Sequence, residues 1–320
     1  MTEGGSELVT PRPLGGHETA SIMGLPFHLL DHPTLIRIFL EGVRARNGGW
    51  IVTPNLDILR QFTTSAESRE LILEASHRIA DGQPIVWASR LAGTPVPERV
   101  PGSDLVLSMP EAAARAGLRI FLLGGRDRNV AALAAARLKA RCPGLERVDA
   151  YCPPFGFEDD PGELQKIKEA LRGARPELVL IGLGFPKQER LIRLMRAEMP
   201  ETWFVGVGIS ISFLAGIQPR APAALQRLGL EWMHRLCHEP HRLFRRYVIK
   251  GLPFALRLLA WAMRERLRSH GRVYGRALSD GASAPAANGR GVQDTESTYL
   301  PTVDPSRASG AAVEDPPRAA

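Results

Sequence analysis

The sequence predicts an α/β fold in which helices cover a parallel, Rossmann-like sheet. Short apolar runs alternate along the chain with amphipathic segments of helical length, as in folds built from strand–helix–strand units. Several runs end in glycines or polar side chains, as strands do where an open parallel sheet meets its ligand. Strands are expected in residues 50–52, 85–87, 119–123, 178–184 and the start of 204–213. Helices are expected in residues 33–45, 67–79, 129–140, 163–171, 190–199 and 228–247.

Composition divides the 320 residues into four parts. Residues 1–20 are polar and contain several Gly and Pro, and residues 277–320 are mostly Ala, Gly, Ser, Pro and scattered charge, so both ends are expected to be disordered. Residues 21–230 suffice for an α/β core, and residues 231–276 form a basic helical appendage. Three cysteines without a CxxC pair argue against a disulfide framework. No signal-peptide pattern is visible, which predicts a cytoplasmic protein.

Positive charge is concentrated in the appendage. The net charge is +7, yet residues 219–276 alone contain 13 Lys and Arg against three acidic residues. The rest of the chain is therefore slightly acidic. A basic end of this kind predicts an anionic partner, either nucleic acid or a phospholipid surface.

Residues 204–247 join an apolar, glycine-bearing run to a basic helical segment through a turn at residues 218–222. Gly206 and Gly208 allow another backbone or a phosphate to approach closely, although a core strand with a tight turn explains them equally well. The basic segment that follows favours a site closed by cations.

Polar residues follow two of the apolar runs. Thr53 and Asn55 come after residues 50–52, where they either line a ligand crevice or cap the next helix, and for Thr53 alone the cap is favoured. Asp81 is either a turn former or a general base. Arg99 is an anion ligand or an ordinary surface residue, and Ser103 or Asp104 suits a helix N-cap.

Glycine turns suggest a nucleotide site. Gly124 and Gly125 separate a strand from a helix whose N-terminal N–H groups are available to a phosphate, but the complete GxGxxG fingerprint of dinucleotide-binding proteins is absent. Lys187 and Gln188 lie between a strand end and a helix start, where nucleotide-binding groups often lie. The aromatic loop within residues 151–160 either shapes a pocket or packs on the edge of the core.

An ordered set of motifs resembles one family. The motifs are TPNLD (53–57), ADGQPIVW (80–87), RVPGSDL (99–105), FLLGG (121–125), GLGFPKQE (182–189), GVGISISFLAG (206–216), RAPAALQRLGLEW (220–232) and EPHRLFRRY (239–247). Together they resemble the WecG/TagA/CpsF family of bacterial glycosyltransferases, over roughly residues 21–250.

The resemblance implies inverting transfer of a hexose or N-acetylhexosamine-type sugar from a UDP-sugar to a polyprenyl-pyrophosphate-linked acceptor in cell-surface polysaccharide synthesis. It implies no metal and no cofactor. Asp81 matches the proposed base, while Thr53, Asn55, Arg99 and Gln188 match polar active-site positions. The remaining implied substrate-binding positions are Gly182, Gly184, Gly206 and Gly208 around the nucleotide and Arg235, Arg242 and Arg245 in the appendage.

The appendage also predicts attachment to the inner face of the cytoplasmic membrane. Arg242, Arg245, Arg246 and Lys250 are spaced as one helical stripe, and residues 252–263 include an apolar face that is too short to span a bilayer. Trp261 is expected near the lipid interface, although a helix packed on the core explains the pattern too. Because no nucleic-acid module is visible, a nucleic-acid partner is not expected.

Two rival functions remain open on the sequence alone. A nucleotide-binding α/β protein with a nucleic-acid-binding end explains the basic segment, and a nucleotide-cofactor oxidoreductase explains the core. The sequence does not specify the donor sugar, the acceptor or the oligomeric state, so a homo-oligomer is allowed.

Overall fold

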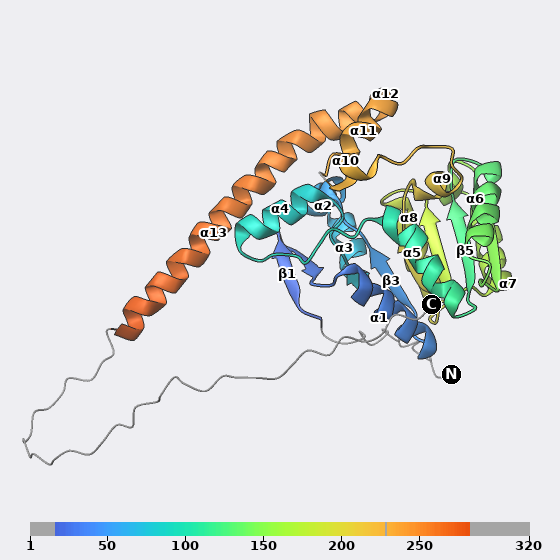
Figure 1. The fold of residues 1–320 in the computed structure, drawn as a ribbon, viewed down its shortest axis with the longest axis horizontal. Coiled ribbons are helices and arrows are strands. Elements are labelled where there is room, and N and C mark those ends of the chain that lie inside the picture. The colour runs from blue at the N-terminus through green and yellow to red at the C-terminus, as the bar shows by residue number, and fades with distance from the viewer. Residues whose placement is uncertain (1–16, 228, 282–320) are drawn as a thin grey trace, which may run out of the picture. The chain divides into compact units, whose positions relative to one another are not determined.

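The computed structural model describes residues 17–227 and 229–281 and confirms the predicted α/β fold (Figure 1). Six parallel strands form the central sheet, and two antiparallel strands form a separate hairpin. In spatial order, the strands of the sheet are β4 (His77–Arg78), β3 (Gly49–Val52), β8 (Trp203–Gly206), β7 (Leu178–Gly182), β5 (Arg119–Gly124) and β6 (Arg147–Tyr151). The hairpin strands are β1 (Thr19–Ile22) and β2 (Leu25–His28).

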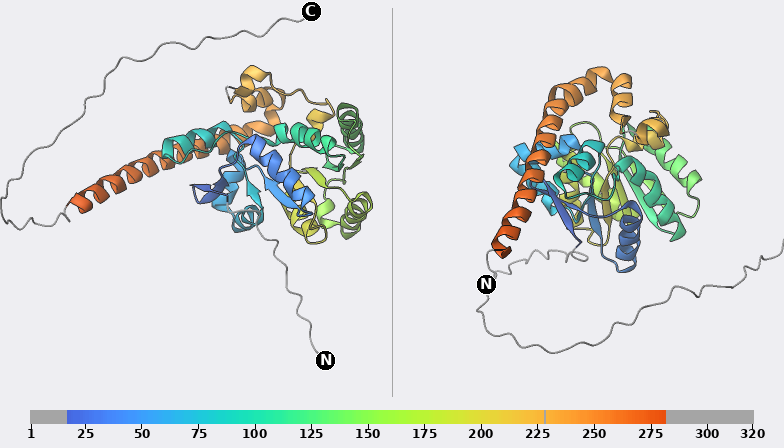
Figure 2. Two further views of the ribbon diagram at one scale, coloured as in Figure 1. Left: turned by 60° about the horizontal axis from the view of Figure 1, so that its bottom comes forward. Right: turned by 60° about the vertical axis from the view of Figure 1, so that its left-hand side comes forward.

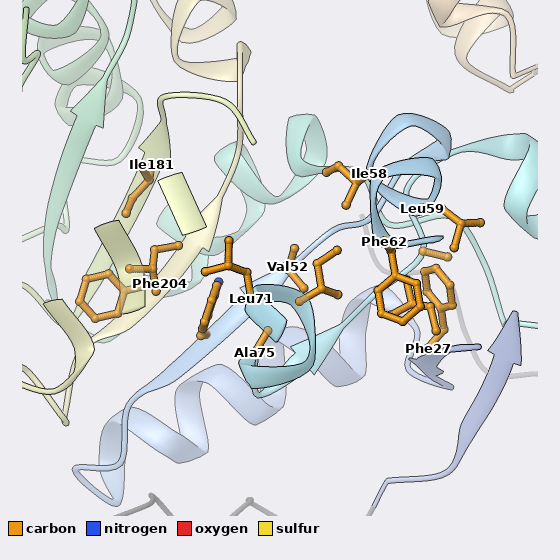
Figure 3. Close-up of a cluster of buried hydrophobic side chains, with 14 of the residues drawn as sticks. Phe27, Val52, Ile58, Leu59, Phe62, Leu71, Ala75, Ile181 and Phe204 are labelled. Carbon is orange, nitrogen blue, oxygen red and sulfur yellow. The ribbon is translucent and has the colours of Figure 1, made fainter. Parts of the chain in front are cut away.

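Alternate strand residues enter two separate cores. Phe121 and Leu123 of β5 lie in one core, shown in part in Figure 3, whereas Ile120 and Leu122 lie in the other. Both faces of a parallel sheet are normally buried, which explains why these strands appear in the sequence as continuous apolar runs. The first core is covered by the hairpin and by α2 (Leu56–Thr64), α3 (Ala66–Glu74), α4 (Gln83–Ala92), α7 (Pro161–Ala174), α8 (Lys187–Arg196) and α13 (Leu252–Gly281). The second core is covered by α1 (His32–Arg44), α5 (Gly102–Arg115), α6 (Arg128–Arg141) and α9 (Ser210–Leu214).

The order of the strands identifies one crevice at the carboxyl edge of the sheet. From β5 the chain continues outward through α6 to β6, whereas from β7 it continues in the opposite direction through α8 to β8. Open α/β sheets bind ligands where neighbouring strands diverge in this way. The β5–β7 pair, in which Gly124 lies opposite Gly182, is therefore the expected ligand position.

Several local predictions were wrong. Residues 85–87 belong to helix α4 because Pro84 starts that helix, Gly93 ends it in a left-handed conformation, and the buried residues between them recur at helical spacing. The helix expected over 67–79 ends at Glu74, since His77 and Arg78 pair with β3 instead. The apolar run 204–213 contains β8 and then α9. The hairpin, β6 and the short 3₁₀ turn η1 (Phe157–Asp159) were not predicted.

The basic segment that follows the turn at residues 218–222 forms several short helices rather than one continuous helix. It consists of α10 (Ala223–Arg227), α11 (Glu231–His238), α12 (Pro240–Phe244) and the π-helical turn η2 (Arg245–Gly251). Because hydrogen bonds in a π-helix skip one further residue, side chains do not keep the α-helical spacing on which the predicted Arg242–Lys250 stripe depended. Arg246 instead pairs with Asp57 of α2 at 3.0 Å.

The expected unstructured ends overlap with structure at their inner limits. Strand β1 begins at Thr19, inside the range 1–20, and α13 continues to Gly281, past the predicted end at residue 276. Residues 1–16 and 282–320, which make up most of the two predicted extensions, lie outside the described residues. The chain forms one compact unit through Tyr274, and of the unit that starts at Gly275 the structure describes only the end of α13.

Trp203 determines how closely α1 and β3 approach β8. Its fully buried ring lies where side-chain atoms of Gly42 and Gly49 would be, with a Cβ at Gly42 only 2.6 Å from the ring, and its indole N–H donates to the Asn47 carbonyl at 3.1 Å. Gly42 and Gly49 are therefore needed because a side chain at either position would overlap the Trp203 ring.

We therefore expect Gly42→Ala to destabilise the protein by roughly 1–3 kcal/mol, although alanine favours helices, because the added methyl overlaps Trp203. Gly173→Ala is the matched control, since Gly173 also lies in a helix but has nothing within 4 Å of the added methyl. It is expected to stabilise by about 0.4–1 kcal/mol. Urea unfolding of both variants measures the difference, and equal effects would contradict the packing argument.

Candidate functional site

Three turns meet at the carboxyl edge of β3 and β4. The Asp81 N–H donates to the Pro54 carbonyl at 3.0 Å, and the Ala80 carbonyl accepts from the Val100 N–H at 2.9 Å. Thr53 is buried at this junction, and its hydroxyl lies 3.6 Å from the position that a Cβ on Gly102 would take. The backbone thus brings together residues 53–55, 80–82 and 99–102, which are far apart in the sequence.

Asn55, one of the two caps that the sequence allowed, caps α2, whereas Thr53, for which the cap was favoured over a place in the ligand crevice, does not. The Asn55 Oδ1 accepts from the N–H groups of Asp57 and Ile58 at 3.1 and 3.2 Å. Its carboxamide oxygen is thereby engaged, so its amide nitrogen is the atom left to contact a ligand. The predicted caps Ser103 and Asp104 are wrong, because α5 begins at Gly102 with Pro101 in the N-cap position.

The Asp81 carboxyl is electrostatically unusual. Part of the residue still reaches solvent, yet burial of the carboxyl raises its pKa to about 7. Arg99 and Arg235 lower that pKa, and Glu231 and Asp104 raise it. A pKa close to neutrality suits a group that must both accept and release a proton.

The basic segment is held over this edge by ion pairs. Arg99 contacts Glu231 at 3.3 Å with both side chains largely buried, so Arg99 is not a solvated loop residue. Arg220 pairs with Asp104 and also donates to Ser103 at 3.1 Å. In addition, a Cβ on Gly229 would lie 2.6 Å from the Gln83 side chain, so the turn before α11 rests directly on the start of α4.

The three predicted appendage arginines are not equivalent. Arg235 is partly buried and acts on the pKa of Asp81. Arg245 is exposed in η2, and Arg242 belongs to α12, although its side chain is not among those described. Of the two arginines in this set whose side chains are described, the structure brings Arg235 to Asp81.

The site glycines fall into two groups. A Cβ at Gly124, Gly182 or Gly206 would lie within 2.7 Å of neighbouring atoms, so these residues allow backbones and side chains to pack. Gly184 and Gly208 have positive φ angles of 82° and 55° and nothing within 4 Å of a Cβ, so their turns face open space. Only the second group is placed to admit a ligand.

In the crevice between β5 and β7, the start of α6 differs from the phosphate site that the sequence suggested there. Gly125 leads into α6, but Asp127 caps that helix by accepting from the Val130 N–H at 3.0 Å. A carboxylate already occupies the helix start, which makes it a poor phosphate site. Lys187, at the start of α8, pairs with Glu158 and lies 4.7 Å above the exposed Phe155 ring.

Gln188 lies buried between the strand ends. Its Oε1 accepts from the Gly184 N–H at 3.2 Å and its Nε2 donates to Glu189 Oε1 at 2.9 Å. Its carboxamide thus connects the Gly184 turn to a second buried carboxyl group, which sequence reasoning missed.

A polar hollow of about 500 Å³ opens beside the Arg220–Asp104 ion pair, lined in part by Arg99, Asp104 and Arg220. Within the part of the chain that the structure describes, no group of three or more His, Cys, Asp or Glu residues is arranged to hold a metal ion. None of the described helices is long and apolar enough to cross a membrane.

Sequence reasoning did not identify Glu231, Arg220 or Glu189 as members of the site. All three lie inside the recognised motifs, so the motifs contained a signal, but their roles depend on partners more than a hundred residues away or on burial.

The two members of the Arg99–Glu231 ion pair are expected to have opposite effects on the pKa of Asp81. Arg99→Gln should raise the pKa of Asp81 further above 7, because a stabilising cation is removed, and Glu231→Gln should lower it, because a repelling anion is removed. Carboxyl-carbon NMR titration of Asp81 measures both. Glu98→Gln is the control, as Glu98 makes no contribution to this pKa, and shifts of the same sign in both variants would contradict the assignment.

Comparisons with known proteins point to one family. The profile of the family described as "Glycosyl transferase WecG/TagA/CpsF family" matches residues 20–268. The chain is 30% identical over 250 residues to proteins of Staphylococcus aureus strains MW2 and NCTC 8325, covering 76% of this chain and 93% of each relative. The corresponding protein of strain MRSA252 is 29% identical over the same shares. All three are named N-acetylglucosaminyldiphosphoundecaprenol N-acetyl-beta-D-mannosaminyltransferase.

Proposed function

The chain belongs to the WecG/TagA/CpsF family of glycosyltransferases, and from this we propose that it transfers N-acetylmannosamine from a UDP-linked donor to N-acetylglucosamine on undecaprenyl diphosphate. The donor and acceptor are taken from the names of its relatives. The structural observation that carries the proposal is the carboxyl group of Asp81, whose pKa is raised to about 7. It lies beside Thr53, Asn55 and Arg99 at the carboxyl edge of the sheet.

Asp81 is the proposed base. Its carboxylate takes the proton from the acceptor hydroxyl, whose oxygen attacks the anomeric carbon while the bond from that carbon to the UDP oxygen breaks, with inversion. The departing diphosphate needs cations. Arg99 and Arg235 already act electrostatically on Asp81, so they lie near enough to supply positive charge at this point.

The nucleotide is proposed to lie in the β5–β7 crevice and to extend toward Gly208. The divergence of the strands and the open turns at Gly184 and Gly208 support this placement. The predicted phosphate site at the start of α6 is not part of it, because Asp127 occupies that helix start.

We expect Asp81→Asn to reduce transfer by roughly two to four orders of magnitude while UDP binding is retained, because the amide cannot accept the proton. In the wild type, kcat should rise with pH through about 7 as Asp81 ionises, and this rise should be absent from the residual activity of the variant. Steady-state kinetics across pH measure both. Asp149→Asn, a change on β6, is the control; near wild-type transfer by Asp81→Asn would refute the mechanism.

The donor is tested by turnover with UDP-N-acetylmannosamine, UDP-N-acetylglucosamine and UDP-glucose, with undecaprenyl-diphosphate-linked N-acetylglucosamine as acceptor. The proposal expects UDP-N-acetylmannosamine to be the preferred donor. A parallel thermal-shift series with UDP, NAD and DNA separates the rival classes, since a bound ligand raises the melting temperature. Stabilisation by NAD or DNA, but not by UDP, would overturn the proposal.

Attachment to the membrane surface through α13 is part of the proposal. Phe254, Leu258 and Ala262 bury one face of this helix in the first core, and α13 lies beside α4 (Figure 2), where Arg266 is 3.0 Å from the Cβ position of Gly93. Trp261, which was predicted to lie near the lipid interface, is partly buried against this core. The outward face exposes a row of large apolar side chains, Leu252, Leu256, Met263 and Leu267, with Arg257, Arg264 and Arg268 also exposed.

We expect the combined change Leu256→Gln, Met263→Gln and Leu267→Gln to reduce binding to anionic vesicles at least tenfold, because apolar burial in lipid is lost. These residues are more than half exposed, so the fold should persist, whereas deletion of α13 would also remove part of the core. Co-sedimentation with vesicles of phosphatidylglycerol measures binding. Leu133→Gln and Leu194→Gln, on other exposed helix faces, form the control; unchanged binding of the triple variant would refute the attachment.

A further inference from the structure

One buried carboxyl group near the crevice has no part in the chemistry described above. Glu189 lies in the first turn of α8 and is completely buried, and its Oε2 atom has no hydrogen-bond partner among the described residues. A buried polar atom without a partner destabilises a fold. An apolar residue would avoid that loss, so Glu189 must contribute something that an apolar side chain does not.

The hydrogen bond that the Glu189 side chain accepts from Gln188 helps to determine which way the Gln188 carboxamide points. The Gly184 N–H needs an acceptor, which is Gln188 Oε1 at 3.2 Å, and the opposite end of the carboxamide therefore presents its NH₂ group. Glu189 Oε1 accepts from that group at 2.9 Å. If the carboxamide were reversed, two donors would meet at Gly184 and the Gln188 NH₂ group would lose the Glu189 oxygen that accepts from it, so the Gly184 N–H and the Glu189 acceptor together favour one orientation.

The space around Gln188 is restricted as well. Its Nε2 atom occupies the place where a Cβ on Gly206 would be, and its side chain is 5% exposed. Glu189, Gln188 and Gly206 thus form a packed support behind the Gly184 turn, whose outer side is open.

Among the residues that the structure describes, no charged group lowers the pKa of Glu189. Burial raises its pKa to about 7, and only the hydrogen bonds from Gln188 and from its own backbone lower it. The charged residues on α8 and on α3, which packs against it, are Lys187, Arg190, Arg193, Arg196, Glu67, Arg69, Glu70 and Glu74. Glu67 and Glu74 pair with Arg190 and Arg193 away from the buried carboxyl, and strand β8 contributes no titratable side chain.

We propose that Glu189 is a positioning residue of the nucleotide pocket, which acts through Gln188 to hold the Gly184 turn in the shape that receives the UDP diphosphate. This inference rests on the proposed function. In its neutral form the carboxyl supplies the acceptor that Gln188 needs without placing a negative charge behind a diphosphate.

The first test compares UDP affinity, by calorimetry at pH 6.5, in Glu189→Gln and Glu189→Leu. Glutamine still offers an acceptor to Gln188 and should bind UDP within about threefold of wild type. Leucine removes the acceptor and should weaken UDP at least about tenfold, the equivalent of one lost hydrogen bond. Glu163→Leu is the matched control, since Glu163 is also buried but contacts Tyr151 and Lys166, and its UDP affinity should not change.

The second test uses pH and does not depend on the stability of the leucine variant. Asp81 also has a pKa of about 7, so its contribution to the pH dependence must be eliminated. Comparing Asp81→Asn with Asp81→Asn/Glu189→Gln does this, because both variants lack the Asp81 carboxyl. From pH 6.5 to 8.5, UDP affinity of the single variant should fall by about three- to tenfold more than that of the double variant, because ionised Glu189 disfavours the diphosphate.

The outcomes are separable. Wild-type UDP affinity in a folded Glu189→Leu variant, equal losses in the glutamine and leucine variants, or identical pH dependence of the single and double variants would each overturn the positioning role. Absence of UDP binding by the wild-type protein would instead overturn the proposed function, and this inference with it.

Discussion

The close approach of β5, β7 and β8 at their carboxyl ends is the constraint on which the site depends. Gly124 and Gly182 face each other across the β5–β7 pair, and a Cβ at Gly182 would lie 2.5 Å from the Gly208 carbonyl. Side chains at these positions would separate the strands or displace the turns. Gly184 and Gly208 lie in the turns just beyond these strand ends, and because they too lack a Cβ they take left-handed conformations that border open space.

The fold class could be predicted from the sequence because a parallel sheet buried on both faces requires apolar runs, and those runs are visible without any partner information. The run 85–87 was assigned to the wrong element because three apolar residues fit a buried strand and a buried helix face equally well. The hairpin and β4 were missed because each is four residues or fewer and gains its stability from tertiary contacts.

The positions of the site residues could be predicted from the sequence, but their chemical state could not. The positions followed from the ordered motifs, and the structure brings Thr53, Asn55, Asp81 and Arg99 to one edge. The state of Asp81 was not predictable, because its pKa depends on burial and on Glu231, which lies 150 positions along the chain. Nor could the sequence separate glycines that make room for packing from glycines that border open space. That distinction depends on which atoms surround each Cβ position.

The π-helical turn η2 has a consequence for how this protein can change by insertion or deletion. A π-turn accommodates one residue more than an α-helical turn, and each residue rotates an α-helix by about 100°. If one residue were lost between Arg245 and Gly251, the helix after it would rotate by roughly that angle relative to α12. Phe254 and Leu258 would then leave the core, and Ala255, Leu259 and Met263 would take the buried positions instead. The length of this single turn therefore fixes the rotational phase of α13, and substitutions should be tolerated there more readily than any change in residue number.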